Sequence, residues 1–179
     1  RIVVAMSGGV DSSCAAYLVK SKGWEVMGIS MRLWPEEECG FYRPQGCSSL
    51  EGISDARLFA EKINIPFYVI DFHKEFKKEV IDYFSREYLS GRTPNPCILC
   101  NEKIKFGILL KKAKALGAEY IATGHYAKIE FDKRRKQFLL REGRDKKKDQ
   151  SYALFSLTQK QLGSIRFPLG GKTKSWVRG

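Results

Sequence analysis

A glycine turn, Ser-Gly-Gly-Val-Asp-Ser at residues 7–12, is the first segment whose residue types could do chemistry. It joins an apolar, β-branched run to a helical pattern, so its backbone N–H groups and the positive end of the helix can hold phosphate oxygens. The turn lacks the Gly-Lys-Ser/Thr ending of a Walker P-loop, which disfavours ordinary transfer of a γ-phosphoryl group. Asp11 could instead hold Mg²⁺ on a pyrophosphate. A tight strand-to-helix connection without a ligand is the alternative interpretation.

A second chemical signal is the pair of thiols at Cys97 and Cys100, a spacing typical of reactive or metal-binding cysteines in a reducing compartment. We expect Cys100 to open a helix, where the helix dipole and the nearby Lys103 and Lys105 raise the reactive thiolate fraction. The pair could also form a redox couple. With a third cysteine it could hold an iron–sulfur cluster, although two thiols are too few for a complete ligand set.

Three further cysteines carry weaker signals. Cys39 and Cys47 fall in a region without periodicity, where they could form a disulfide bond or share a zinc site with the Cys97–Cys100 pair. Cys14 falls on a helical pattern, where a small buried residue is the usual explanation. We assign none of the three a catalytic role.

Strands and helices alternate along most of the chain. Apolar runs predict strands at residues 2–6, 26–33, 67–70 and 120–123, and helical spacing predicts helices at residues 12–22, 53–63, 76–88 and 104–116. Residues 34–52 show no period and are predicted to form a long loop. The alternation predicts an α/β fold with a doubly wound, Rossmann-like parallel sheet. The glycine turn then lies at the carboxyl end of its strand, where open sheets bind ligands.

The pattern changes after the fourth predicted strand. Residues 126–131 and 137–141 are strand-like around a charged turn, which predicts a β-hairpin appended to the sheet. We therefore expect one domain at residues 1–143. Residues 144–179 contain a basic loop, a short helix near Gln159 and an unfinished end, and are interpreted as the incomplete start of a further module.

Composition limits the partners. The 32 Lys and Arg residues exceed the 20 Asp and Glu residues, and the net charge of +12 favours a polyanionic partner, with a basic solubilising surface as the alternative. No apolar run approaches the roughly 18 residues that span a bilayer, so no membrane is expected. We expect a cytoplasmic location. The chain opens at Arg1 inside a strand-like run, which leaves a lost leader segment and an organellar matrix open.

The glycine turn resembles the SGGxDS signature of the PP-loop ATP pyrophosphatases, which cleave ATP between the α- and β-phosphates and adenylate a substrate oxygen. Within that superfamily, Thr-Pro-Asn-Pro-Cys-Ile-Leu-Cys-Asn at residues 93–101 resembles the tRNA-specific 2-thiouridylases. Three more segments, residues 122–127, 148–152 and 166–170, are similar to motifs of the same family in the same order. The resemblance covers essentially the whole chain.

The resemblance implies roles at matching positions. Residues implied in nucleotide binding are Ala5, Met6, Ser7, Gly8, Gly9, Val10, Asp11 and Ser12 around the phosphates, with Met31 and Gly124 on the adenosine. Residues implied in contacts with the target uridine are Asn95, Pro96 and Cys97, and those implied in tRNA contact are Lys148, Asp149 and Gln150. Cys100 would be the catalytic thiol.

The implied activity is ATP-dependent 2-thiolation of the wobble uridine of a tRNA. ATP with Mg²⁺ adenylates the C2 oxygen, and sulfur from a donor protein such as a cysteine desulfurase relay replaces it through persulfide chemistry. The base must leave its stack to react. The family's second catalytic cysteine belongs to a segment expected beyond Gly179, so we expect this chain to be part of a longer protein. Many family members have Asp where this chain has Cys97.

Two other functions stay open at this point. The chain could be another PP-loop adenylating enzyme, such as an amidotransferase-type synthetase or a different tRNA thiolase. A synthetase that uses ammonia would need no thiol at Cys100. The chain could also be a basic RNA-binding module with a vestigial turn and a structural metal on its cysteines. Metal analysis and an ATP titration separate these alternatives.

Overall fold

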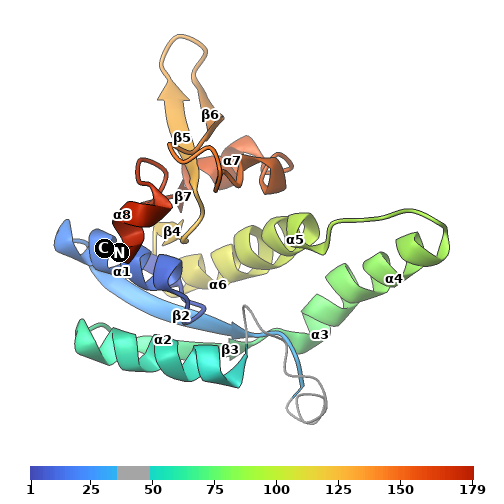
Figure 1. Ribbon diagram of the computed structural model, residues 1–179, viewed down its shortest axis with the longest axis horizontal. Helices are drawn as coiled ribbons and strands as arrows, with labels where there is room; N and C mark the ends of the chain where they lie inside the picture. The colour runs from blue at the N-terminus through green and yellow to red at the C-terminus, as the bar shows by residue number, and fades with distance from the viewer. Residues whose placement is uncertain (36–48) are drawn as a thin grey trace.

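Five parallel strands form the central sheet of the computed structural model, which describes residues 1–35 and 49–179 (Figure 1). The strands are β1 (Ile2–Ala5), β2 (Val26–Arg32), β3 (Phe67–Asp71), β4 (Tyr120–Ala122) and β7 (Ile165–Arg166), in the order β3-β2-β1-β4-β7. The predicted parallel α/β fold is therefore confirmed. The sequence did not reveal β7, because two residues are too few to establish a strand period. It pairs with β4 through Ile121 and Ile165.

Two helices cover one face of the sheet, namely α1 (Val10–Ser21) and α2 (Leu50–Lys62). Alternation along β1 directs Ile2 and Val4 toward this face, where they pack in one cluster with Ala16 and Ala56. Helix α2 begins before the predicted residue 53 because the Ser49 side chain caps it, accepting a hydrogen bond from the N–H of Gly52 at 3.0 Å.

The other face carries two longer helical runs. The first consists of α3 (His73–Phe76), the π-helical η2 (Lys77–Ile81) and α4 (Asp82–Leu89). The second consists of α5 (Pro96–Leu99), the π-helical η3 (Cys100–Leu109) and α6 (Leu110–Ala115). The buried side chains of η3 and α6 pack against the sheet in a cluster that includes Val3, Ile29 and Ile121.

The second run corrects one expectation about Cys100. The helix begins at Pro96, because Asn95 is its N-cap and accepts a hydrogen bond from the N–H of Cys97 at 2.9 Å. Cys100 therefore lies in the second turn and does not open the helix. The expectation was wrong because Asn-Pro is a strong cap and first-turn pair, so the helix starts four residues before Cys100.

The predicted hairpin is present as β5 (Ala127–Asp132) and β6 (Gln137–Glu142), which project from the body of the molecule at the top of Figure 1. After it come η4 (Ser151–Ala153), α7 (Gln159–Gly163), strand β7 and α8 (Lys174–Arg178). The C-terminal end, which was expected to be unfinished, contains the helix α8, and this helix lies against α1. The division into domains at residue 143 stays a prediction.

The predicted loop at residues 34–52 lies mostly outside the described residues, as do Cys39 and Cys47 with their proposed disulfide or zinc site. Within the described ranges, no helix combines the length and apolar character needed to cross a membrane.

Candidate active site

A cavity of about 340 Å³ lies at the carboxyl ends of β1 and β4, where the strand order of the sheet reverses. Its lining residues come from five parts of the chain: β1 with the glycine turn, the end of β2, η3, the segment after β4, and the C-terminal part. The lining residues are Ala5, Met6, Ser7, Asp11, Ser12, Met31, Lys105, Thr123, Gly124, His125, Tyr126, Lys148, Gln150 and Lys174. Segments from five parts of the chain therefore meet at one edge of the sheet.

The glycine turn is held by side chains of its own serines. The Ser12 hydroxyl accepts a hydrogen bond from the N–H of Ser7 at 3.1 Å and donates one to the carbonyl of Gly9 at 2.9 Å. Gly8 has a φ of +79°, and a Cβ there would lie 2.2 Å from the carbonyl oxygen of Gly52. The turn thus packs directly on the first turn of α2. Gly52 was missed from the sequence, because nothing local signals this approach.

Gly124 brings the segment after β4 against the start of α1. A Cβ at Gly124 would lie 2.8 Å from the carbonyl carbon of Asp11 and 2.9 Å from the backbone nitrogen of Ser12. Only a residue without a side chain allows this approach. Gly124 therefore forms the cavity wall where the two segments meet.

Asp11 is held by two side chains from distant segments. Its Oδ1 accepts hydrogen bonds from the Tyr126 hydroxyl and from Nζ of Lys174, both at 2.7 Å, and its Oδ2 accepts from Nζ of Lys174 at 2.6 Å. Burial, together with the hydrogen bond to Asp11, raises the pKa of Tyr126, so its hydroxyl stays a donor. Lys174 was not predicted as a site residue. Its pairing with Asp11 depends on α8, which the sequence pattern did not reveal.

The lining is strongly basic. Lys105, Lys148 and Lys174 come from three separate segments, and Asp11 is the single carboxylate among the described residues that line the cavity. A surplus of positive charge in a concave site attracts anionic ligands. The electrostatics therefore suit a polyphosphate.

His125 is a neutral polar group in the wall of this cavity. Burial, reinforced by the charge of Lys105, lowers the pKa of its imidazole to about 3. Its Nδ1 lies 2.7 Å from Oγ1 of Thr123, and its ring packs beside the rings of Phe106 and Phe167. His125 therefore presents an uncharged ring to any ligand at neutral pH.

The predicted tRNA-contact residues divide into two kinds. Lys148 and Gln150 line the cavity, and Gln150 is fixed there because its Oε1 accepts from the N–H of Tyr126 at 3.1 Å. Asp149 faces inward instead, accepting from the N–H of Gly143 at 2.7 Å and from the Ser151 hydroxyl at 2.6 Å. The carboxylate of Asp149 therefore holds the loop in shape.

The cysteine motif does not line the cavity. Cys97 is exposed and Cys100 is 8% exposed, and neither forms a disulfide bond with another described residue. Asn101 connects the two regions, because its Nδ2 donates a hydrogen bond to the carbonyl of Ala153 at 3.1 Å. This contact ties the helix of Cys100 to the loop that carries Lys148.

The suggested iron–sulfur cluster finds no support. Within residues 1–35 and 49–179, no three His, Cys, Asp or Glu side chains converge as a metal site would require. Eight of the predicted site residues do not line the cavity, namely Gly8, Gly9, Val10, Asn95, Pro96, Cys97, Cys100 and Asp149.

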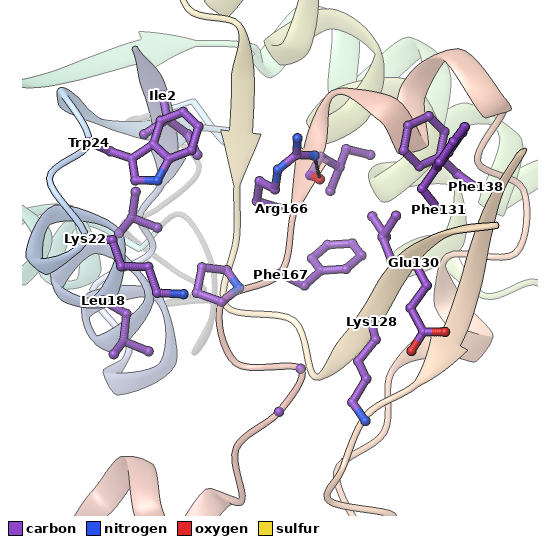
Figure 2. A pocket seen from close by; sticks show the side chains of 16 residues that line it. Ile2, Leu18, Lys22, Trp24, Lys128, Glu130, Phe131, Phe138, Arg166 and Phe167 are labelled. Carbon is purple, nitrogen blue, oxygen red and sulfur yellow. Dashed lines mark hydrogen bonds between the residues drawn. The ribbon is translucent and has the colours of Figure 1, made fainter. Parts of the chain in front are cut away.

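A larger cavity of about 620 Å³ lies elsewhere, between α1, β7 and the hairpin (Figure 2). Figure 2 shows Lys22 and Leu18 on one side, with Lys128 and Glu130 on the other. None of the predicted site residues lines it, and it lacks the glycine turn. We therefore take the smaller cavity as the candidate site.

A parallel sheet with a glycine turn after its first strand and a basic cavity at the strand switch defines a Rossmann-like, nucleotide-binding class of α/β domain. Its fold is shared with a solved structure from Methanocaldococcus jannaschii, described as a predicted subunit of tRNA methyltransferase. The TM-score is 0.52 at 16% identity, covering 99% of this chain and 73% of that one. The sequence model of the tRNA methyl transferase HUP domain family matches residues 1–179, and the chain belongs to that family.

Curated relatives carry a different activity in their names. The chain is 53% identical over 178 residues to the tRNA-specific 2-thiouridylase MnmA of Clostridium perfringens, covering 99% of this chain and 49% of that protein. It is 55% identical over 176 residues to the protein of the same name from Moorella thermoacetica, covering 98% of this chain and 49% of that protein. The chain thus spans about half the length of the curated relatives it matches.

Proposed function

We propose that this chain is the ATP-binding, catalytic portion of a tRNA-uridine 2-sulfurtransferase. The observation that carries the proposal is the cavity itself, in which a glycine turn, three lysines and one carboxylate surround a space at the strand switch. The high identity to proteins named as 2-thiouridylases indicates that the reaction is a thiolation. The family description mentions methyl transfer, and we favour thiolation because those relatives match the chain at 53% and 55% identity.

The cavity suits ATP in its charge and in the groups that line it. The glycine turn and the first turn of α1 offer N–H groups to phosphate oxygens, and the lysines balance the charge of the phosphates. Met31 contributes apolar surface to the lining, and the adenine ring is proposed to pack there. Asp11 is the side chain that would hold Mg²⁺, which neutralises charge on the pyrophosphate when it is bound.

The chemistry begins at a poor electrophile, the C2 carbonyl of uridine. The C2 oxygen attacks the α-phosphorus of ATP, pyrophosphate leaves, and an adenylated base results. A sulfur nucleophile then attacks C2, and AMP departs with the original oxygen. Lys105 and Lys148 lie where they can stabilise the charge that accumulates on the phosphates.

Cys100 is the proposed catalytic thiol. A donor protein loads a persulfide on a second cysteine, in the part of the longer proteins that this chain does not span, and the outer sulfur of that persulfide attacks C2. The Cys100 thiolate then attacks the inner sulfur, so the S–S bond breaks, the thiolated base is released and the two cysteines form a disulfide.

The helix of Cys100 is joined through Asn101 to the loop that we propose contacts the tRNA through Lys148 and Gln150. Asn95, Pro96 and Cys97 precede Cys100, and the exposed Cys97 fits a contact with an extruded base. We place the reaction in the cytoplasm or a matrix compartment, where thiols stay reduced.

The test is a comparison of Cys100→Ala with Cys97→Ala in the intact protein. Two quantities are measured: ATP-dependent pyrophosphate release with tRNA, and transfer of labelled sulfur from a cysteine desulfurase system into the tRNA. We expect Cys100→Ala to lose sulfur transfer by about a hundredfold or more while it binds ATP normally. Cys97→Ala removes a proposed base contact and leaves the Cys100 thiol, so it should weaken tRNA binding and keep most of the sulfur transfer at saturating tRNA.

Two results would reject this function. Full sulfur transfer by Cys100→Ala would remove the proposed role of the thiol, and an adenylating enzyme that uses another nucleophile would replace it. A wild-type protein that binds RNA but ignores ATP would point to the RNA-binding module with a vestigial turn.

A further inference from the structure

We propose that Lys174 binds the β- and γ-phosphates of the nucleotide, in place of the lysine that the glycine turn lacks; this inference rests on the proposed function. A Walker P-loop places its lysine next to the last glycine of the turn, and this chain has Val10 and Asp11 there. Lys174 comes from the other end of the chain, yet its ammonium lies on the carboxylate of Asp11, in the first turn of α1.

The backbone around Lys174 is fixed by its neighbours. Thr173 caps α8, because its Oγ1 accepts from the N–H of Trp176 at 3.3 Å. The N–H of Lys174 donates to Oδ2 of Asp145 at 2.9 Å, and Val177 packs in a cluster with Ala15 of α1. The side chain is 17% exposed and is directed at the cavity that it lines. These contacts fix the position of Lys174 in the folded protein.

Lys174 is the best placed of the three lysines that line the cavity. Lys148 is exposed on a loop, and Lys105 lies near His125 in the segment after β4, so neither ammonium is held at the first turn of α1. The ammonium of Lys174 alone among these three is hydrogen-bonded to the first turn of α1, the end where N–H groups collect phosphate oxygens. A long flexible stem with three rotatable donors lets it follow a phosphate over a short distance.

The pairing also implies an exchange of partners. Both oxygens of Asp11 accept hydrogen bonds from Lys174, and Oδ1 accepts another from Tyr126, so the ammonium neutralises the charge and occupies acceptor sites that Mg²⁺ would use. A nucleotide that arrives with Mg²⁺ offers each group a new partner, the metal for Asp11 and the phosphates for Lys174. The ion pair therefore occupies the site in the absence of nucleotide and separates when the nucleotide binds.

The experiment compares Lys174→Met with Lys172→Met in the intact protein. Lys172 is a matched control, because it lies in the same segment with its ammonium over the ring of Trp176, 3.7 Å from the centroid. Calorimetry gives the Kd for ATP with Mg²⁺, for ATP with EDTA and for AMP. We expect Lys174→Met to raise both ATP Kd values by about tenfold or more, and to leave the AMP Kd within about twofold. Lys172→Met should bind all three like the wild type.

A double variant, Asp11→Asn with Lys174→Met, separates a direct contact from charge balancing. If Lys174 contacts the phosphates, the double variant stays weak for ATP in EDTA. If Lys174 only neutralises Asp11, the double variant recovers wild-type affinity for ATP in EDTA, and the inference is overturned. Lys174→Arg keeps the charge and should recover part of the affinity.

The affinity for a metal ion alone should change in the opposite direction to the affinity for ATP. In the absence of nucleotide, Lys174→Met should bind Mn²⁺ more tightly than the wild type, because Asp11 is released; electron paramagnetic resonance measures this directly. ATP affinity unchanged in Lys174→Met would overturn the inference while leaving the proposed function intact. Failure of the wild type to bind ATP would reject both.

Discussion

At the scale of single residues, the site depends on ionisable groups whose charge is set by their surroundings. Tyr126 remains a protonated donor because burial and Asp11 raise its pKa. His125 remains neutral because burial and Lys105 lower its pKa to about 3. The cavity therefore keeps a constant pattern of donors and charges around neutral pH, as a site for a polyanion requires.

His125 gives a prediction about pH and stability. Its folded pKa of about 3 is below the unfolded value of 6.5, so between these values the unfolded chain binds a proton that the folded chain does not. His125 thus lowers the free energy of unfolding as pH falls from 6.5 toward 3. Urea unfolding at pH 7.5 and pH 5 should show that His125→Asn loses less stability on acidification, by on the order of 1–2 kcal/mol. Equal losses in the variant and the wild type would contradict this assignment.

At the scale of elements, the site exists because backbone segments approach more closely than side chains allow. The segment after β4 meets α1 at Gly124, and the glycine turn meets α2 at Gly8. These contacts bring the residues after two neighbouring strands to one cavity. The helix of Cys100 is connected to the same region through Asn101.

We expect Gly124→Ala to lower the free energy of unfolding by about 1–3 kcal/mol and to weaken ATP binding, because its Cβ would overlap the backbone of Asp11 and Ser12. Gly171→Ala is the control, since a Cβ there meets nothing within 4 Å. The control should stay within about 0.5 kcal/mol of the wild type. Denaturant unfolding and an ATP titration measure both effects, and a neutral Gly124→Ala would show that the two segments can separate without cost.

At the scale of the whole molecule, the C-terminal part is joined to the sheet and to the cavity. Strand β7 extends the sheet next to β4, Ile165 and Leu169 are fully buried, and α8 lies against α1. Residues from β7 onward thus share the core of the part before residue 143. Residues 144–179 would behave as a separate domain if they unfolded independently of the part before residue 143.

The unfolding of Ile165→Ala addresses that question. We expect one cooperative transition and a loss of about 2–4 kcal/mol, because the cavity left by the side chain lies in the shared core. Leu58→Ala is the control, since Leu58 is 61% exposed on α2, and it should change stability by well under 1 kcal/mol. Two separate transitions, with only one shifted by Ile165→Ala, would support a domain boundary near residue 143.

The sequence by itself determined the features that depend on local pattern. Apolar runs and helical periods placed four of the five strands, the hairpin and the glycine turn, because strand and helix periods are local properties. Side-chain types in that turn also indicated a phosphate site. The start of the Cys100 helix differs from the expectation, although its Asn-Pro cap is a local feature.

Only the tertiary structure decided which distant residues meet at the site. Lys174 lies on Asp11, Gly52 lies against Gly8, and Asp149 turns inward, and none of these contacts has a local signature. Strand β7 is recognisable as a strand only through its pairing with β4. Such contacts arise because burial of the apolar core brings remote segments together, and their free energy comes from packing and not from the propensity of any short stretch.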